Sequence, residues 1–224
     1  MSKYKNRDLF LSTYLAPNET KFEGILEEIT TFLGTEEFDY FGLIGGVDTN
    51  LNYISMLKPK NSHLFDINPL ALDYAKIRLE NLDEIDIIST QEEILEKLHQ
   101  KVFDMNHFKK AKKRLSEYFK IMNANEYSKN MLWANNLDST KIYCQEINLY
   151  QFDFFDDDLN NITKISKNAV IYISNTPEWL NKKGGPGIEK LISSLEKNFS
   201  HLQKGVVISS RFERNKILAK IKNV

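Results

Sequence analysis

The stretch FGLIGGVDTN, residues 41–50, decides how the chain is expected to fold. A short run of aromatic and β-branched residues ends there in Gly42, Gly45 and Gly46, and a helix-like stretch follows. Glycine lets a ligand approach the backbone, and the first turn of a helix offers free N–H groups to negative charge. The stretch therefore predicts a loop that holds a nucleotide, and its residue types bear on which nucleotide that is.

The segments around this stretch alternate between strand and helix patterns. The predicted elements are a helix at 19–33, a strand at 38–44, a helix at 51–57, a strand at 62–68, a helix at 68–82, strands at 140–147 and 168–175, a helix at 187–202 and a strand at 205–211. Gly34 ends the first helix, and Asp48, Thr49 or Asn50 is expected as the N-cap of the second. This order predicts an α/β fold with a mostly parallel sheet and helices on both faces.

Residues 84–135 interrupt the alternation and contain almost only helix formers, which predicts a helical insertion. The basic run KKAKKR within it, residues 109–114, is more typical of a solvated helix face than of a nucleic-acid site. No linker rich in Pro, Gly or Ser divides the chain. We therefore expect one domain over residues 1–224, with the insertion inside it.

The composition excludes several classes of protein. Lys and Arg together number 30 against 31 Asp and Glu, so no global field attracts nucleic acid. Cys144 is the single cysteine, and the four histidines have no metal-ligand spacing, which predicts neither disulfides nor a metal site. No segment approaches the roughly 20 apolar residues that span a bilayer. A cytoplasmic protein without a transmembrane segment is expected.

The glycine pattern distinguishes between nucleotides. A nicotinamide or flavin site uses G-x-G-x-x-G, whereas this chain has G-x-x-G-G-V-D-T-N. Asp48 would place negative charge where a pyrophosphate lies, but it suits the ammonium group of an amino-acid tail. S-adenosylmethionine carries such a tail and no phosphate, and residues 42–55 contain no Lys or Arg. Asp66, at the end of the next predicted strand, is placed to accept hydrogen bonds from a ribose diol. The alternative is that the glycines only form a turn and Asp66 only caps a helix.

Four segments together resemble a known family: FGLIGGVDTNLNYISMLKP, SHLFDINPLAL, NAVIYISNTPEWL and GVVISSR. They are similar to the class I S-adenosylmethionine-dependent transferases, whose fold is Rossmann-like. Within that fold they look most like the 3-amino-3-carboxypropyl transferases of betaine-lipid synthesis. The matching residues are Gly45, Gly46, Asn50 and Tyr53, then Asp66, Asn68 and Pro69, then Ser174, Asn175 and Trp179.

The resemblance implies S-adenosylmethionine as cofactor and a set of residues that bind it. These residues are Gly45, Gly46, Asn50, Asp66, Ile67, Asn68, Glu146, Ser174 and Asn175. Glu146 enters because we expect it at the end of the third strand, near the adenine amine. Asp48, Tyr53 and Glu178 are the candidates for a catalytic role. Gly184, Gly185 and Gly187 predict a turn or a lid.

The reaction expected from the resemblance is aminocarboxypropyl transfer to an amine or hydroxyl, with methylthioadenosine as by-product. Methyl transfer is the first alternative; a nicotinamide oxidoreductase and a non-catalytic module that kept the fold are the others. The acceptor stays open among a small molecule, a lipid head group, a peptide and a nucleotide. The basic helix at 107–114 suits peripheral membrane contact.

Overall fold

The computed structural model describes residues 22–44, 47–82, 132–144, 146–174, 176–177, 187–211 and 214–223. Gly45 and Gly46 lie outside these ranges, as do the basic run at 109–114 and Gly184 and Gly185. Of the insertion predicted at 84–135, only its last residues are described, and they form the short helix α8, Leu132–Asn135.

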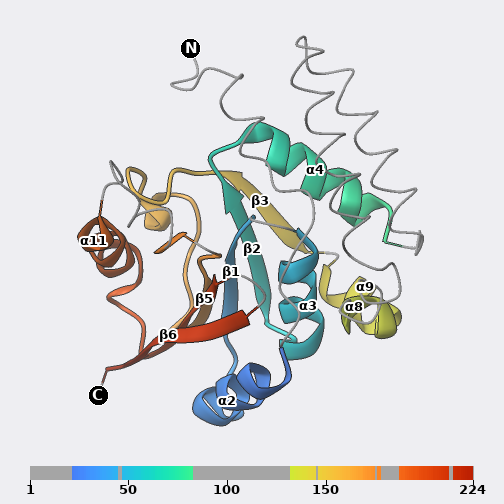
Figure 1. Ribbon diagram of the computed structural model, residues 1–224, viewed down its shortest axis with the longest axis horizontal. Helices are drawn as coiled ribbons and strands as arrows, with labels where there is room; N and C mark the ends of the chain where they lie inside the picture. Colours follow the sequence, from blue (N-terminus) through green and yellow to red (C-terminus); the bar gives the residue numbers. More distant parts are fainter. Residues whose placement is uncertain are drawn as a thin grey trace.

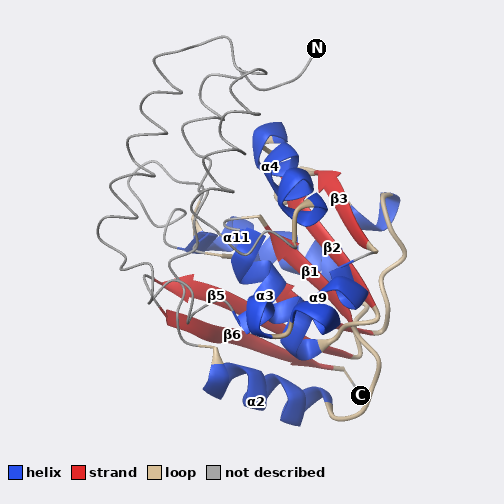
Figure 2. Ribbon diagram, turned by 90° about the vertical axis from the view of Figure 1, so that its right-hand side faces the viewer, coloured by secondary structure: helices blue, strands red, loops and turns tan. Residues whose placement is uncertain are grey.

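The described residues form an α/β structure around a six-stranded sheet. Its strands are β1 (Asp39–Leu43), β2 (Asn61–Asp66), β3 (Ile147–Gln151), β4 (Asn168–Tyr172), β5 (Lys204–Arg211) and β6 (Arg214–Lys222). They lie in the order β3-β2-β1-β4-β5-β6, with β3 and β6 at the two edges (Figure 2). All neighbouring pairs are parallel except β5 and β6. The prediction of a mostly parallel α/β sheet is confirmed.

Helices pack on both faces of this sheet. They are α2 (Glu23–Leu33), α3 (Val47–Leu57), α4 (Pro69–Glu80), α8, α9 (Leu137–Cys144) and α11 (Ile188–Phe199). In Figure 1, α11 lies on one side of the strands, and α3, α8 and α9 lie on the other. Successive strand residues alternate between two apolar clusters: Tyr40 and Val170 face the side of α3, whereas Phe41 and Ile171 face α11. None of the helices described is long and apolar enough to cross a membrane.

Several helix ends follow from the residues that the sequence analysis singled out. Gly34 has a φ of 70° and donates its N–H to the Thr30 carbonyl, which ends α2. Lys58 has a φ of 54°, and α3 ends just before it. At its other end α3 begins at Val47, so Asp48 lies inside the first turn, and the predicted N-cap position was wrong.

The third strand is the larger error. Residues 140–147 were predicted as a strand, but they are helical up to Cys144, and β3 begins only at Ile147. The Thr140 hydroxyl donates to the Trp133 and Asn136 carbonyls, and Cys144 is buried in the core on the side of α3. Packing of α9 on α3 therefore outweighs the strand preference of these residues.

Strand β6 was not predicted. Its residues alternate apolar side chains with Lys216, Lys220 and Lys222, and it pairs antiparallel with β5. Lysines are common on edge strands because they oppose pairing with another chain. Strand β6 thus forms one edge of the described sheet.

Candidate functional site

The candidate site lies at the carboxyl edge of the sheet, where β1 and β4 are neighbours. From β1 the chain moves outward to β2 and β3 and then returns to β4, so the connections diverge at this point. Ligands of open α/β sheets bind outside the carboxyl ends of the strands at such a point. Leu43 and Asp66 end β1 and β2 there, and Ser174 follows the end of β4 at Tyr172.

Asn50 has a structural task at this edge. Its Oδ1 accepts from the Tyr40 hydroxyl at 2.9 Å, and its Nδ2 donates to the Leu43 carbonyl at 3.2 Å. A Cβ on Gly42 would lie 1.9 Å from Asn50 Oδ1. Gly42 therefore allows close packing of α3 on β1, and the buried Asn50 amide joins the two elements. The Asn50 side chain therefore takes part in this packing, whereas we expected it to contact a cofactor.

Asp48 is buried and forms an ion pair. Its Oδ1 lies 3.2 Å from Arg78 Nε, and neither side chain is exposed to solvent. Arg78 comes from the last turn of α4, and its guanidinium lies 4.8 Å from the centre of the Trp133 ring. The positive charge of Arg78 therefore compensates the negative charge that the sequence analysis assigned to this loop.

Tyr53 lies in the core on the α3 side of the sheet. Its ring contacts those of Phe22, Tyr40 and Tyr172, at centroid distances of 5.2, 6.1 and 5.4 Å. None of its side chain is exposed. This packing is typical of an aromatic core residue, whereas we expected Tyr53 to contact the acceptor or the cofactor tail. Tyr172, expected to be a core residue, is one.

Asp66 is the acid best placed for a ligand. It ends β2, and its Oδ1 accepts from the Asn68 N–H at 2.8 Å. Burial raises the pKa of this carboxyl to about 7, although hydrogen bonds from the backbone of Asn68 and Ile67 act in the opposite direction. Within the described residues no side-chain donor reaches Asp66.

Ile67 and Asn68 continue the chain from Asp66 into α4. The Ile67 side chain is partly exposed, and its carbonyl accepts from Gln151 Nε2 at 3.4 Å. Asn68 is buried, and its carbonyl accepts from the N–H groups of Ala71 and Leu72. Asn68 thus starts α4, and Ile67 lies beside Asp66 at the carboxyl edge, where its apolar contact to a purine was expected.

Ser174 follows β4 in an uncommon backbone conformation. Its φ is 52°, a region that residues other than glycine rarely adopt, and its carbonyl accepts from the Ser210 N–H of β5. Such conformations cluster at functional sites. Asn175, Glu178 and Trp179 lie outside the described residues.

Glu146 lies at the opposite edge of the sheet. It immediately precedes β3, whose first residue, Ile147, pairs with Ser62 near the start of β2. Its neighbours include Glu37 and Lys60, which also lie at the amino ends of strands. The expectation that Glu146 ends the third strand near an adenine was wrong, because it depended on the misplaced strand. The carboxyl end of β3 is Gln151, which pairs with Asp66.

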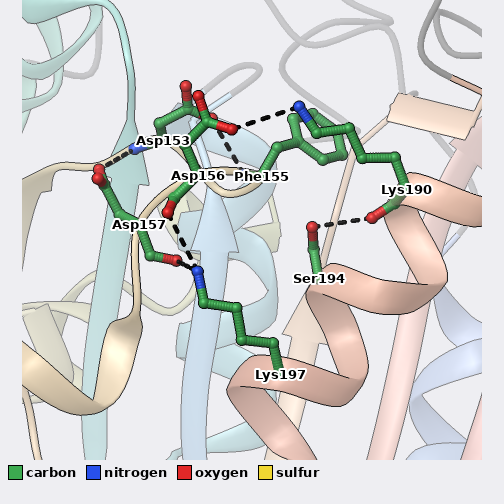
Figure 3. Close-up of polar contacts among 7 residues, drawn as sticks. All are labelled: Asp153, Phe155, Asp156, Asp157, Lys190, Ser194 and Lys197. Atoms are coloured by element: carbon green, nitrogen blue, oxygen red, sulfur yellow. Dashed lines mark hydrogen bonds and ion pairs between the residues drawn. The ribbon is translucent and has the colours of Figure 1, made fainter.

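The acid-rich loop after β3 is bound to α11 (Figure 3). Lys190 Nζ lies 3.4 Å from Asp156 Oδ1, and Lys197 Nζ donates to the Asp156 and Asp157 carbonyls. In the described parts of the chain no group of three or more His, Cys, Asp or Glu side chains is arranged to hold a metal ion. The loop therefore has a structural role in joining β3 to α11.

Arg78 is the residue of this edge that the sequence analysis missed. It occurs in DYAKIRLE, where a charged side chain reads as part of an exposed helix face. The buried positions of this segment are Ala71, Tyr74, Ala75, Arg78 and Leu82. Arg78 falls at helical spacing with these apolar residues, and this spacing could have indicated that its side chain is buried.

Comparisons with known proteins place the chain in no family. No family model matches it, and no curated protein was found that matches it significantly. The class of protein is therefore given by the fold alone: an α/β protein whose buried acid and unusual backbone turn lie at the carboxyl edge of a mostly parallel sheet.

Proposed function

We propose that this chain is an S-adenosylmethionine-dependent transferase with a Rossmann-like fold. The observation that carries the proposal is Asp66 at the carboxyl end of β2, where its carboxyl receives only backbone hydrogen bonds from the described residues. A carboxylate offers about four acceptor positions, so capacity is left for both hydroxyls of a ribose. The strand order supports the proposal, because the first β-α-β unit of such folds presents an acid at this position.

When bound, S-adenosylmethionine supplies a carbon activated by a positive sulfonium. The acceptor forms a bond to that carbon, the carbon–sulfur bond breaks, and its electron pair stays on sulfur. The protein has to hold acceptor, carbon and sulfur in line and to exclude water. Transfer of the aminocarboxypropyl group remains our first proposal and methyl transfer the alternative; the acceptor is a small molecule, a lipid head group, a peptide or a nucleotide.

The structure changes the roles that we expected for two of the three candidate catalytic residues. Asp48 is paired with Arg78 and Tyr53 is a core residue, so neither is proposed as a base. Glu178 stays a candidate by its sequence position alone. If the acceptor must lose a proton, a base within hydrogen-bonding reach of it is required, and Glu178→Gln with unchanged turnover would exclude this residue.

The proposal is tested first by binding and then by product. We expect S-adenosylmethionine to raise the melting temperature of the protein, because a ligand that binds only the folded state stabilises it. Incubation with cell extract should then yield methylthioadenosine, whereas S-adenosylhomocysteine would show methyl transfer. A protein that no adenosine ligand stabilises would be a non-catalytic module, and the proposal would fail.

A nicotinamide-binding oxidoreductase is the second candidate. The Asp48–Arg78 ion pair favours it, since the buried guanidinium compensates the acid that argued against a pyrophosphate. The glycine pattern still argues against it. Stabilisation by NAD and none by S-adenosylmethionine would select this candidate.

A further inference from the structure

The Arg78 guanidinium carries hydrogen-bond donors that the fold leaves unused. Its Nε is engaged by Asp48, but Nη1 and Nη2 are buried and have no hydrogen-bond partner among the residues that the structure describes. Trp133 Nε1, on the ring over which the guanidinium lies, is also buried and has no partner in the described part of the chain. Burying donors unsatisfied is costly, so this arrangement needs an explanation.

All of these unused groups are donors. The two Nη groups of an arginine form a fork that matches two oxygens of one carboxylate or phosphate. Trp133 Nε1 adds one more N–H nearby, and Trp can only donate. A ligand that satisfies this set must therefore present acceptors, and an anion with two oxygens does so best.

The position of Arg78 also favours an anion. Its Nε lies 3.2 Å from the carboxylate of Asp48, which is in the first turn of α3. Free N–H groups and the helix dipole make such a helix start favourable for negative charge. Asp48 and Arg78 compensate each other, so a bound anion meets the helix start and the unused fork without a net repelling charge.

We propose that Arg78 is the receptor for the carboxylate of an α-amino-acid group, the tail of S-adenosylmethionine. Nη1 and Nη2 donate to the two carboxylate oxygens, and Trp133 holds the guanidinium plane from one side. The inference rests on the proposed function, since it assigns the part of the cofactor that distinguishes S-adenosylmethionine from other adenosine ligands. Arg78 is thus a binding residue that the glycine loop by itself did not reveal.

The test uses two ligands that differ only in the carboxylate: S-adenosylmethionine and its decarboxylated form. Calorimetry on the wild-type protein should give a dissociation constant about 10- to 100-fold lower for S-adenosylmethionine. In Arg78→Met that ratio should fall to about 1, and in Arg78→Lys, which keeps the charge but not the fork, to an intermediate value. Lys76→Met, an exposed cation on the same helix, is the control and should keep the wild-type ratio.

The measured affinities distinguish a failure of the Arg78 assignment from a failure of the proposed function. A carboxylate preference that persists in both Arg78 variants would overturn the inference and leave the proposed function intact. An equal loss of both ligands in Arg78→Lys, at unchanged ligand ratio, would show a structural role and also overturn it. If wild-type protein binds neither ligand, the proposed function itself fails. If it binds NADH and the Arg78 variants do not, the anion is a pyrophosphate, and the carboxylate assignment is wrong.

Discussion

The polar groups at the amino ends of the strands differ from those at the carboxyl ends in how they are hydrogen-bonded. At the amino edge, Asp39 accepts from Asn61 Nδ2 at 2.8 Å and from the Ser166 N–H at 2.9 Å. Glu36 there pairs with Lys204 and Glu37 with Lys60.

At the carboxyl edge, by contrast, Arg78 keeps unused donors, Asp66 has a raised pKa and Ser174 has a positive φ. Asn168 Oδ1, at the amino end of β4, is also buried without a partner among the described residues, so the difference is one of degree. Under the proposed function, the amino ends of the strands contribute stability, and the underused groups at the carboxyl ends bind a ligand.

The largest effect is expected at the amino edge from Asp39→Ala. The change leaves two partly buried donors, Asn61 Nδ2 and the Ser166 N–H, without their acceptor. We expect a loss of about 3 to 5 kcal/mol in the free energy of unfolding, measured by urea denaturation. Asp138→Ala, an exposed acid on α9, is the control and should cost less than about 0.5 kcal/mol. A folded Asp39 variant with weakened ligand binding would contradict the division between the edges.

The next effect concerns the close packing of α3 on β1. Gly42→Ala places a Cβ 1.9 Å from Asn50 Oδ1 and 2.9 Å from the Tyr40 ring, so the amide has to leave its partners. We expect a loss of roughly 2 to 3 kcal/mol. The matched control is Gly24→Ala in helix α2, where no atom lies within 4 Å of the added Cβ. That change should stabilise the protein by about 0.5 to 1 kcal/mol. Equal effects at the two glycines would show that Gly42 is not required by packing.

Most strands and helices could be predicted from the sequence. Alternating periodicities located β1, β2, β4 and β5 and four of the helices, because each buries a regular apolar pattern. The pattern failed at 140–147, where β-branched residues serve a helix packed on α3. Glu146 was then assigned to the carboxyl end of a strand, although it precedes β3. The position of a side chain was wrong because the strand that was expected to carry it was misplaced.

Contacts between residues that are distant in the sequence could not be predicted, for a different reason. Asp48 and Arg78 are 30 positions apart in the sequence, and the residues next to either of them do not indicate this contact. Asp48 therefore looked like an isolated charge, and Tyr53 and Asn50 looked like ligand contacts. Their neighbours Tyr40, Tyr172 and Leu43 come from strands that are brought together only by the fold.

Asp66 gives a smaller effect whose sign depends on pH. Its folded-state pKa of about 7 lies above the ordinary value of 3.8, so the folded state binds the proton more tightly. Stability from this group is present below pH 4 and is lost as the pH rises through 7. Asp66→Asn should therefore stabilise the protein at pH 8 by roughly 1 to 2 kcal/mol and hardly at all at pH 4.

The same variant tests the ligand role of Asp66. A ribose diol donates to the charged carboxylate, so wild-type affinity for S-adenosylmethionine should increase as the pH rises through about 7. Asp66→Asn should bind about 10-fold more weakly at pH 8 and lose this pH dependence. Calorimetry at pH 6 and pH 8 measures both. Unchanged affinity would remove Asp66 from the site and with it the main support for the proposed function.

The smallest effect is expected from His63, which lies within β2 between the two edges. Its ring stacks on Phe41 at 4.7 Å, its Nδ1 lies 3.3 Å from the Tyr150 hydroxyl, and burial lowers its pKa. A base with a lowered folded-state pKa is more easily protonated when unfolded, so stability falls as the pH drops below about 6.5. We expect a small loss in the free energy of unfolding between pH 7 and pH 5.

His63→Phe should remove this loss and leave the opposite slope of Asp66 in place. Urea denaturation of wild type, His63→Phe and Asp66→Asn at several pH values separates the two contributions, because they have opposite signs over the same range. His63 contacts no residue of the carboxyl edge among those described, so its replacement should not change the ratio of affinities for S-adenosylmethionine and its decarboxylated form. A changed ratio would mean that the interior of the sheet, and not its carboxyl edge alone, determines how a ligand is held.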